Sequence, residues 1–169
     1  IADPDRGLTM ADVVAAELPP HVPRVAELFE LAAGGGVEVS LDVKDPAAVP
    51  EVVRAARDAG VTERLWLCHH RWRELASWRV GAPEVVLVDS TYLGFMSGGP
   101  AQRVAQLVAA GVDALNLHHS EWTAELVDLA TSAGLRTLGW DAQDAPTIAR
   151  LAVLGLDGVY GDDVALLVA

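Results

Sequence analysis

The residues best suited to chemistry are Asp42 and Lys44, which close a strand-like run that opens at Val37. Because they are two positions apart, both side chains leave the same face of a strand. A carboxylate binds a hard divalent cation such as Mg²⁺ or Ca²⁺, and an ammonium places a positive charge beside a phosphate oxygen. The pair therefore suits metal-assisted phosphoryl chemistry. The alternative is a structural ion pair that holds a strand to a helix.

Two histidine pairs, His69-His70 and His118-His119, each follow an apolar run. Neutral imidazoles together with a carboxylate such as Asp89 are a zinc-type donor set. Adjacent residues on an extended strand point to opposite faces, so each pair is expected to offer one ligand at most. We therefore interpret them as polar loop histidines.

Trp140, Asp162 and Cys68 each have a functional and a structural interpretation. Trp140 ends an apolar run and either lines a pocket or plugs the core. Asp162 either binds substrate hydroxyls or caps the last helix, and capping is the favoured interpretation. Cys68 is expected to be a buried strand residue. The remaining tryptophans are expected to pack between helices and sheet: Trp66, Trp72, Trp78 and Trp122.

Composition narrows the class of protein. The 169 residues are 51% hydrophobic with a mean hydropathy of +0.28, which indicates a folded chain, and we expect one domain over 1–169. With 12 basic against 24 acidic residues, the net charge of -12 argues against a nucleic-acid groove or an anionic membrane surface. No apolar run reaches the ~18 residues of a transmembrane helix. One cysteine excludes an internal disulfide but does not fix the compartment. We expect a cytoplasmic rather than a secreted protein.

Apolar runs alternate regularly with helical patterns, as between 22 and 33 and between 122 and 133. Short, continuous apolar runs are typical of parallel strands that are covered on both faces. Thr9 and Asp12 resemble a capping box before an early helix, and Gly60, Gly111, Gly134 and Gly155 are expected to end helices. The predicted strands are Val37–Val43, Arg64–Cys68, Glu84–Val88, Val112–Leu117, Leu135–Trp140 and Asp157–Tyr160.

Two architectures accommodate this alternation. One is a doubly wound open sheet, and the other is a (β/α) barrel, which in full needs eight strands and ~250 residues. No Gly-rich phosphate loop follows any predicted strand, which weighs against a dinucleotide-binding fold. The pattern by itself leaves both architectures open.

An ordered series of segments resembles the glycerophosphodiester phosphodiesterase family, whose fold is a TIM barrel of the phosphatidylinositol phospholipase C-like type. The resemblance implies metal-dependent hydrolysis of a small-molecule glycerophosphodiester to glycerol 3-phosphate and an alcohol, with Mg²⁺ or Ca²⁺. It also implies that Asp42 binds the metal, that Lys44 acts in catalysis and binds the phosphate, and that Trp140 lines the substrate pocket. The matching segments are Leu8–Val13, Val22–Leu31, Leu41–Lys44, Gly139–Asp144 and Leu154–Asp162.

The sequence departs from the family at its catalytic residues. The family carries His-Arg on its first strand, Glu-x-Asp on its second and another histidine soon after, and none of these precedes Leu8. Asp42 stands where the family has Glu, and Gly161-Asp162-Asp163 replaces Thr-Asp-Arg-Pro. The resemblance therefore implies the last six strands of an eight-strand barrel. We expect these 169 residues alone to be inactive and to self-associate through unpaired strand edges.

Two other functions stay open at this point. A barrel remnant without catalysis would serve as a binding or assembly module. An unrelated aldolase-like barrel would use Lys44 as a Schiff-base nucleophile, which borohydride would trap.

Overall fold

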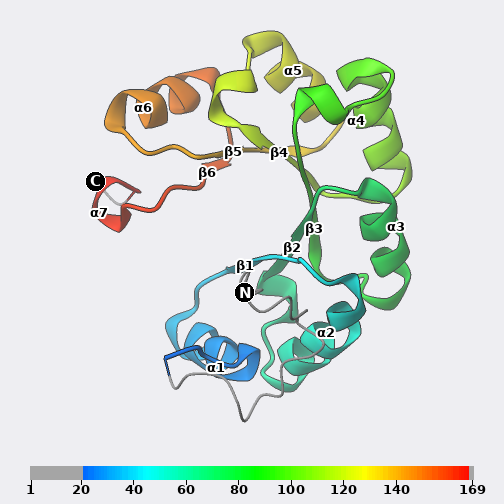
Figure 1. Ribbon diagram of the computed structural model, residues 1–169, viewed down its shortest axis with the longest axis vertical. Helices are drawn as coiled ribbons and strands as arrows, with labels where there is room; N and C mark the ends of the chain where they lie inside the picture. The colour runs from blue at the N-terminus through cyan, green and yellow to red at the C-terminus, as the bar shows by residue number, and fades with distance from the viewer. Residues whose placement is uncertain (1–20, 168–169) are drawn as a thin grey trace, which may run out of the picture.

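The structure, a computed structural model, describes residues 21–167. One parallel sheet pairs its strands strictly in chain order, from β1 to β6 (Figure 1). A doubly wound sheet reverses its strand order at a switch point, so this order is that of a barrel wall. The strands are β1 (Val39–Asp42), β2 (Leu65–His69), β3 (Val86–Thr91), β4 (Ala114–His118), β5 (Arg136–Trp140) and β6 (Gly158–Val159).

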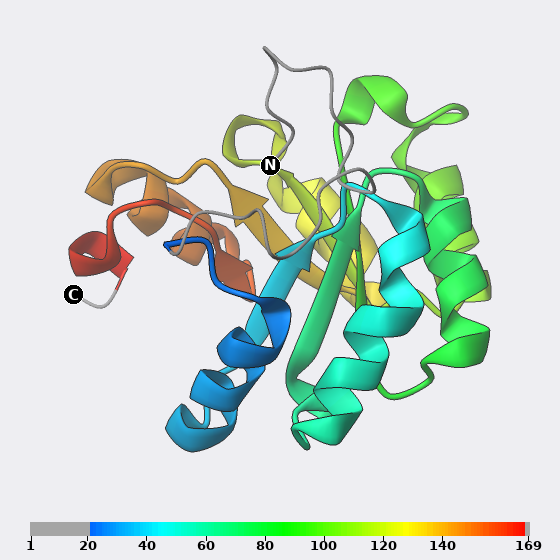
Figure 2. The same cartoon turned by 60° about the horizontal axis from the view of Figure 1, so that its bottom comes forward.

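Helices α1 to α6 surround the outer face of the curled sheet, and α7 follows β6 (Figures 1 and 2). None of the helices in residues 21–167 is long and apolar enough to cross a membrane. The helices are α1 (Val25–Gly35), α2 (Val49–Asp58), α3 (Trp72–Gly81), α4 (Gly99–Ala109), α5 (Ala124–Ser132), α6 (Ala145–Leu154) and α7 (Val164–Leu167). The fold is therefore a curled partial TIM barrel, as the family resemblance implied.

All six predicted strands are present, with ends displaced by at most three residues. The largest displacement is at β3, which continues to Thr91 because its polar end still pairs with β4, Thr91 opposite Leu117. The four glycines expected after helices all have positive φ, among them Gly155 with φ 84° at the end of α6. The proposed capping box at Thr9 and Asp12, and the segment Leu8–Val13, lie outside the described residues.

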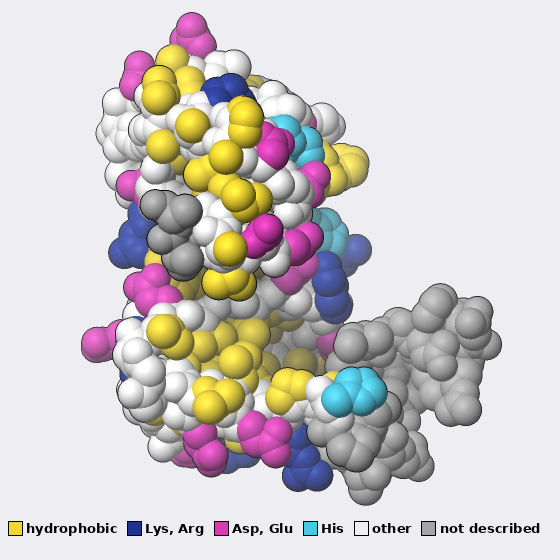
Figure 3. Space-filling view, turned by 90° about the vertical axis from the view of Figure 1, so that its left-hand side faces the viewer, with side chains coloured by type: hydrophobic (Ala, Val, Ile, Leu, Met, Phe, Trp, Pro, Cys, Tyr) yellow, Lys and Arg dark blue, Asp and Glu magenta, His cyan; other side chains and the backbone are white. Residues whose placement is uncertain are grey.

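The sheet does not close on itself within the described residues. Strands β1 and β6 form its two edges, and each pairs with a single neighbour. One side-chain contact reaches across the concave face between the two edges, Ser40 Oγ to Tyr160 OH at 3.0 Å. The open side is hollowed, and hydrophobic side chains gather in the hollow (Figure 3).

Two apolar layers stabilise the fold. The larger lies between sheet and helices and includes Phe29, Leu67, Leu87, Leu107, Leu115 and Leu151, all with 0% exposure. The smaller covers the concave face and contains Trp66, Cys68, Val88, Ala114 and Leu138.

The four tryptophans assigned to packing between helices and sheet do not all lie there. Trp66 lies on the concave face, so its assignment was wrong. Trp78 and Trp122 are buried on the helix side as expected, and Trp72 is partly buried there. Because both faces of a parallel strand are apolar, the sequence pattern does not reveal which face a residue joins.

Asp89 lies on β3 and is fully buried beside Arg103 of α4, with Arg103 Nη1 3.4 Å from Asp89 Oδ2. Burial raises the pKa of the Asp89 carboxyl to about 7, against the opposing charge of Arg103. This position removes Asp89 from the zinc partners considered above.

The raised pKa of Asp89 implies that the folded protein loses stability as the pH rises. The folded protein retains a proton up to pH 7 that the unfolded chain releases near pH 4, so the stabilisation is present at low pH and is lost as pH rises through this window. Because of Asp89, we expect the free energy of unfolding to be about 2 kcal/mol lower at pH 7 than at pH 5.

Urea unfolding of the natural protein and of Asp89→Asn at both pH values measures this difference. Asparagine does not titrate, so the variant should show a flatter pH dependence, whatever its absolute stability beside Arg103. Parallel pH profiles for the two proteins would show that Asp89 is charged in the fold.

Candidate active site

A cleft of about 450 Å³ lies on the concave face, towards the carboxyl ends of the strands. This end of a TIM barrel carries the active site in characterised enzymes of the fold. A second cavity of about 500 Å³ is lined by residues of α3, α4 and the segments before them, outside the sheet. The cleft is lined by Ser40, Asp42, Lys44, Cys68, Ser90, Thr91, Tyr92, Asn116, Trp140 and Tyr160.

Asp42 and Lys44 both line the cleft. Only Asp42 lies on the strand, because β1 ends there and Lys44 follows two residues later. Lys44 Nζ donates to Asp42 Oδ2 at 2.5 Å, and the side chains are 76% and 61% exposed. The pair joins residues only two positions apart, so it does not tie β1 to a helix. Exposed pairs of this kind contribute little stability. The pair is therefore not a contact that holds a strand to a helix, and the chemical roles of Asp42 and Lys44 stay proposals.

Lys44 is also the only lysine of the sequence. An aldolase-type nucleophile needs a desolvated, uncharged amine, whereas Lys44 is exposed and ion-paired. The Schiff-base alternative is thus disfavoured.

Trp140 forms one wall of the cleft. It is partly buried and meets Tyr92 edge to face with 5.0 Å between ring centroids, and His118 with 4.7 Å. Its ring is therefore placed to line a pocket and does not plug either apolar layer. Tyr92 is 44% exposed, so this aromatic wall is accessible from solvent.

Polar side chains of the cleft interior were missed from the sequence. Asn116 Nδ2 donates to Ser90 Oγ at 3.0 Å, and Asn116 Oδ1 is buried without a hydrogen-bond partner in the described part of the chain. Ser40 Oγ lies 3.3 Å from Cys68 Sγ. Burial raises the pKa of the Cys68 thiol, which stays neutral. The available signal was polar residues within otherwise apolar strands, as at Ser40, Ser90 and Asn116.

The two histidine pairs differ in the structure. His69 is buried at the end of β2, and burial lowers the pKa of its ring. Its Nδ1 accepts a hydrogen bond from the Arg71 N–H at 3.1 Å. At the other pair, β4 ends at His118 and a 3₁₀ turn, η6 (His119–Glu121), begins at once. The rings of His118 and His119 lie with centroids 4.3 Å apart, close to the 4.6 Å between the rings of His69 and His70.

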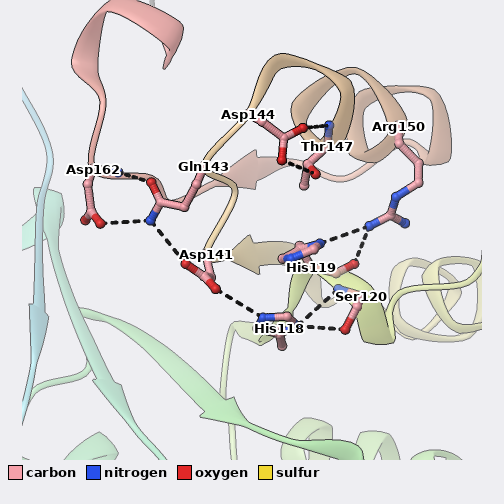
Figure 4. Close-up of polar contacts among 9 residues, drawn as sticks. All are labelled: His118, His119, Ser120, Asp141, Gln143, Asp144, Thr147, Arg150 and Asp162. Carbon is pink, nitrogen blue, oxygen red and sulfur yellow. Dashed lines mark hydrogen bonds and ion pairs between the residues drawn. The ribbon is translucent and has the colours of Figure 1, made fainter.

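His118, His119 and Asp141 have potential ligand atoms all within 4.8 Å of one another (Figure 4). The expectation of one ligand at most was therefore wrong for this pair. It assumed extended backbone through both residues, whereas the chain turns between them.

Asp162 does not cap the last helix. Its carboxylate accepts from Gln143 Nε2 at 2.8 Å, and its N–H donates to Gln143 Oε1 at 3.1 Å (Figure 4). The next residue, Asp163, caps α7 by accepting from the Ala165 N–H at 2.9 Å. The capping assignment was wrong by one position, and Asp162 instead links the segment after β6 to the segment after β5.

Comparisons by sequence find no matching family model and no matching curated protein. Comparison by structure finds a protein assigned as a glycerophosphoryl diester phosphodiesterase from Silicibacter pomeroyi DSS-3, with a TM-score of 0.74 and 28% identity over 87% of this chain and 55% of that one. One from Agrobacterium tumefaciens C58 has a TM-score of 0.75 and 17% identity, over 85% and 61%.

A third similar structure is an Oleispira antarctica phosphodiesterase in complex with the product sn-glycerol-3-phosphate. Its TM-score is 0.63 at 19% identity, over 82% of this chain and 57% of that one. The chain thus spans a little over half the length of these proteins. Its resemblance to the glycerophosphodiester phosphodiesterase family is therefore confirmed, and its structure is similar to part of the barrel of those proteins.

Proposed function

We propose that the concave cleft serves metal-dependent hydrolysis of glycerophosphodiesters, which releases glycerol 3-phosphate and an alcohol. The observation that supports this most is the Asp42–Lys44 pair at the mouth of a polar cleft. The fold is shared with phosphodiesterases, one of which was solved with sn-glycerol-3-phosphate. The chemistry of the cleft fits such a ligand at three points.

The phosphate would lie beside Lys44, whose ammonium is exposed and able to exchange Asp42 for a phosphate oxygen. Glycerol hydroxyls would reach Ser90 and Asn116, where Asn116 Oδ1 is a buried acceptor that lacks a partner among the described residues. The apolar face of Trp140 would cover the carbon skeleton. In this arrangement Lys44 binds the charged phosphate, and Ser90 and Asn116 bind the glycerol hydroxyls.

Asp42 is the residue that would hold a hard divalent cation. Its carboxylate is 61% exposed and lines the cleft, which fits Mg²⁺ or Ca²⁺ bound through one carboxylate, waters and the substrate phosphate. When bound, such a cation polarises the phosphoryl group and stabilises developing negative charge. Asp42 would then give up its contact with Lys44, which frees the ammonium for the phosphate.

The acid and base groups that the resemblance implies, two histidines, are not among the residues that line the cleft. We therefore propose that activity belongs to a protein that also carries those groups, and that the 169 residues alone are inactive. The same observation favours a second candidate function, in which the cleft binds a glycerophosphate group without cleaving it. Association through the edges of β1 and β6 is part of the proposal for the isolated chain, and light scattering measures it.

The direct test of the cleft is a calorimetric titration with sn-glycerol 3-phosphate. Binding needs no acid or base group, so it separates recognition from catalysis. Lys44→Met keeps most of the aliphatic stem and removes the charge, and we expect it to weaken binding at least about tenfold, as loss of a charged hydrogen bond does.

The matched control is Arg54→Met, which removes an exposed cation from α2, outside the cleft. Equal affinities in the natural protein and Lys44→Met, or an equal loss in Arg54→Met, would contradict phosphate binding at Lys44.

A further inference from the structure

A cluster of nitrogen and oxygen donors lies beside the cleft and is not used by the proposed function. It consists of His118 at the end of β4, His119 in η6 and Asp141 just after β5 (Figure 4). It borders a separate hollow of about 320 Å³, and the aromatic pair Tyr92 and Trp140 lines both this hollow and the cleft. The cluster is thus on the far side of the aromatic wall from Asp42.

We propose that His118, His119 and Asp141 bind a borderline divalent cation of the zinc type, at a second metal site that is independent of Asp42. Two imidazoles and one carboxylate are the donors that zinc and its neighbours prefer, whereas Mg²⁺ and Ca²⁺ prefer oxygen alone. Three protein ligands also leave a fourth position open to water or an anion, as in catalytic zinc sites.

The pair His118 and Asp141 already has the spacing of two zinc ligands. Ligand atoms at ~2.0–2.1 Å from a tetrahedral Zn²⁺ lie roughly 3.4 Å apart. His118 Nε2 lies 3.3 Å from Asp141 Oδ2. A bound cation would take the place of the direct contact between these two atoms. His119 needs a small side-chain rotation to complete the set, since the cluster spans up to 4.8 Å.

Neighbouring groups hold both ligands in place. His118 Nδ1 lies 2.7 Å from Ser120 Oγ. With a cation on Nε2 the ring proton stands on Nδ1 and donates to Ser120 Oγ, and the 3.3 Å contact from the Ser120 N–H to Nδ1 is given up. Asp141 Oδ1 accepts from Gln143 Nε2 at 3.1 Å, and Gln143 is fixed in turn by Asp162. Hydrogen bonds of this kind orient the ligands of established zinc sites.

The backbone of Asp141 is a second, independent observation. Asp141 has φ 62°, and it is the one non-glycine residue with positive φ in the described part of the chain. Such a backbone conformation is uncommon for a residue with a Cβ, and residues that adopt it cluster at functional sites. Here it turns the carboxylate towards His118.

The charges around the cluster include one cation, Arg150. Its Nη2 donates to the His119 carbonyl oxygen at 2.6 Å and lies 3.5 Å from His119 Nδ1. The ring contact is at the long limit of a hydrogen bond, so a metal can replace it while the carbonyl bond stays. Asp144 and Glu121 lie on the same rim and offset the charge of Arg150.

The test is a calorimetric titration of the protein with ZnCl₂, after treatment with a chelator and in the presence of excess MgCl₂. We expect binding of one Zn²⁺ that Mg²⁺ does not prevent. Asp141→Asn removes the charged ligand and suits the left-handed backbone, because asparagine adopts it readily. We expect this variant to bind Zn²⁺ at least about tenfold more weakly, and His118→Ala to lose the site.

His70→Ala is the matched control, since His70 is exposed on another loop and should leave the affinity unchanged. Unchanged affinity in Asp141→Asn would overturn the proposal, and so would an equal loss in His70→Ala. Because the His118 ring also accepts from the Ser120 N–H, a misfolded His118→Ala would leave Asp141→Asn to decide. Glycerophosphate binding at Lys44 is a separate readout, so either proposal can fail alone.

Discussion

Lys44→Met is expected to lower kcat/KM for a glycerophosphodiester by roughly 30- to 1000-fold in a catalytically competent form of the protein. This corresponds to about 2–4 kcal/mol of transition-state stabilisation, the usual loss when one preorganised electrostatic donor is removed. Methionine fills the space of the aliphatic stem, and the exposed Lys44–Asp42 pair adds little stability, so the fold should persist. Steady-state kinetics with glycerophosphocholine measures the loss.

Asp42 gives the companion result. Asp42→Ala should abolish activity, whereas Asp42→Glu restores the family's residue and should retain or raise it. Arg54→Met, on the outer helix α2, is the control for a general effect of charge. Full activity in Asp42→Ala would remove Asp42 from the metal site, and an unchanged kcat/KM in Lys44→Met would reduce the pair to a surface contact.

Arg79→Met is expected to lower the free energy of unfolding by about 3 kcal/mol. Arg79 joins the end of α3 to the starts of β3 and β4, and its side chain is 21% exposed. It forms an ion pair with Asp113, whose carboxylate also accepts from the Leu87 N–H at 2.7 Å. Its guanidinium further donates, at 2.8–2.9 Å, to the carbonyl oxygens of Pro83, Val85 and Gly111.

Arg54→Met is a matched control for this change as well. Arg54 pairs with Glu51 and Asp58 on the surface of α2 with its side chain 61% exposed, so its loss should cost under about 1 kcal/mol. Urea unfolding of both variants measures the difference. A loss of similar size in the two proteins would show that the contacts of Arg79 at the base of the sheet do not stabilise the fold.

The strands were predictable because each contains a short apolar run, and the inner strands β2 to β5 are mostly buried on both faces. The same property hid the face on which Trp66 lies. The choice between an open sheet and a barrel depends on strand order, which local patterns do not contain. The family resemblance supplied that choice, and the order β1 to β6 confirms it.

The candidate site was predictable in part. Asp42, Lys44 and Trp140 do line one cleft, because their runs end at the same edge of the sheet. Asn116 was missed, since one polar residue in an apolar strand has no partner in its own sequence neighbourhood. The His118–His119–Asp141 cluster was missed because it depends on a turn at His119 and a left-handed residue at Asp141, which spacing alone does not indicate.

Hydrolysis of glycerophosphocholine tests the central claim most directly. The assay compares these 169 residues with a form of the protein that also carries the His-Arg and Glu-x-Asp segments, each with Mg²⁺ or Ca²⁺ and with EDTA. We predict glycerol 3-phosphate from the longer form only, lost in EDTA. Release of product by the 169 residues alone would contradict the inference that they lack the catalytic segments of the family. A longer form that is inert, or that stays active in EDTA, would contradict the proposed function.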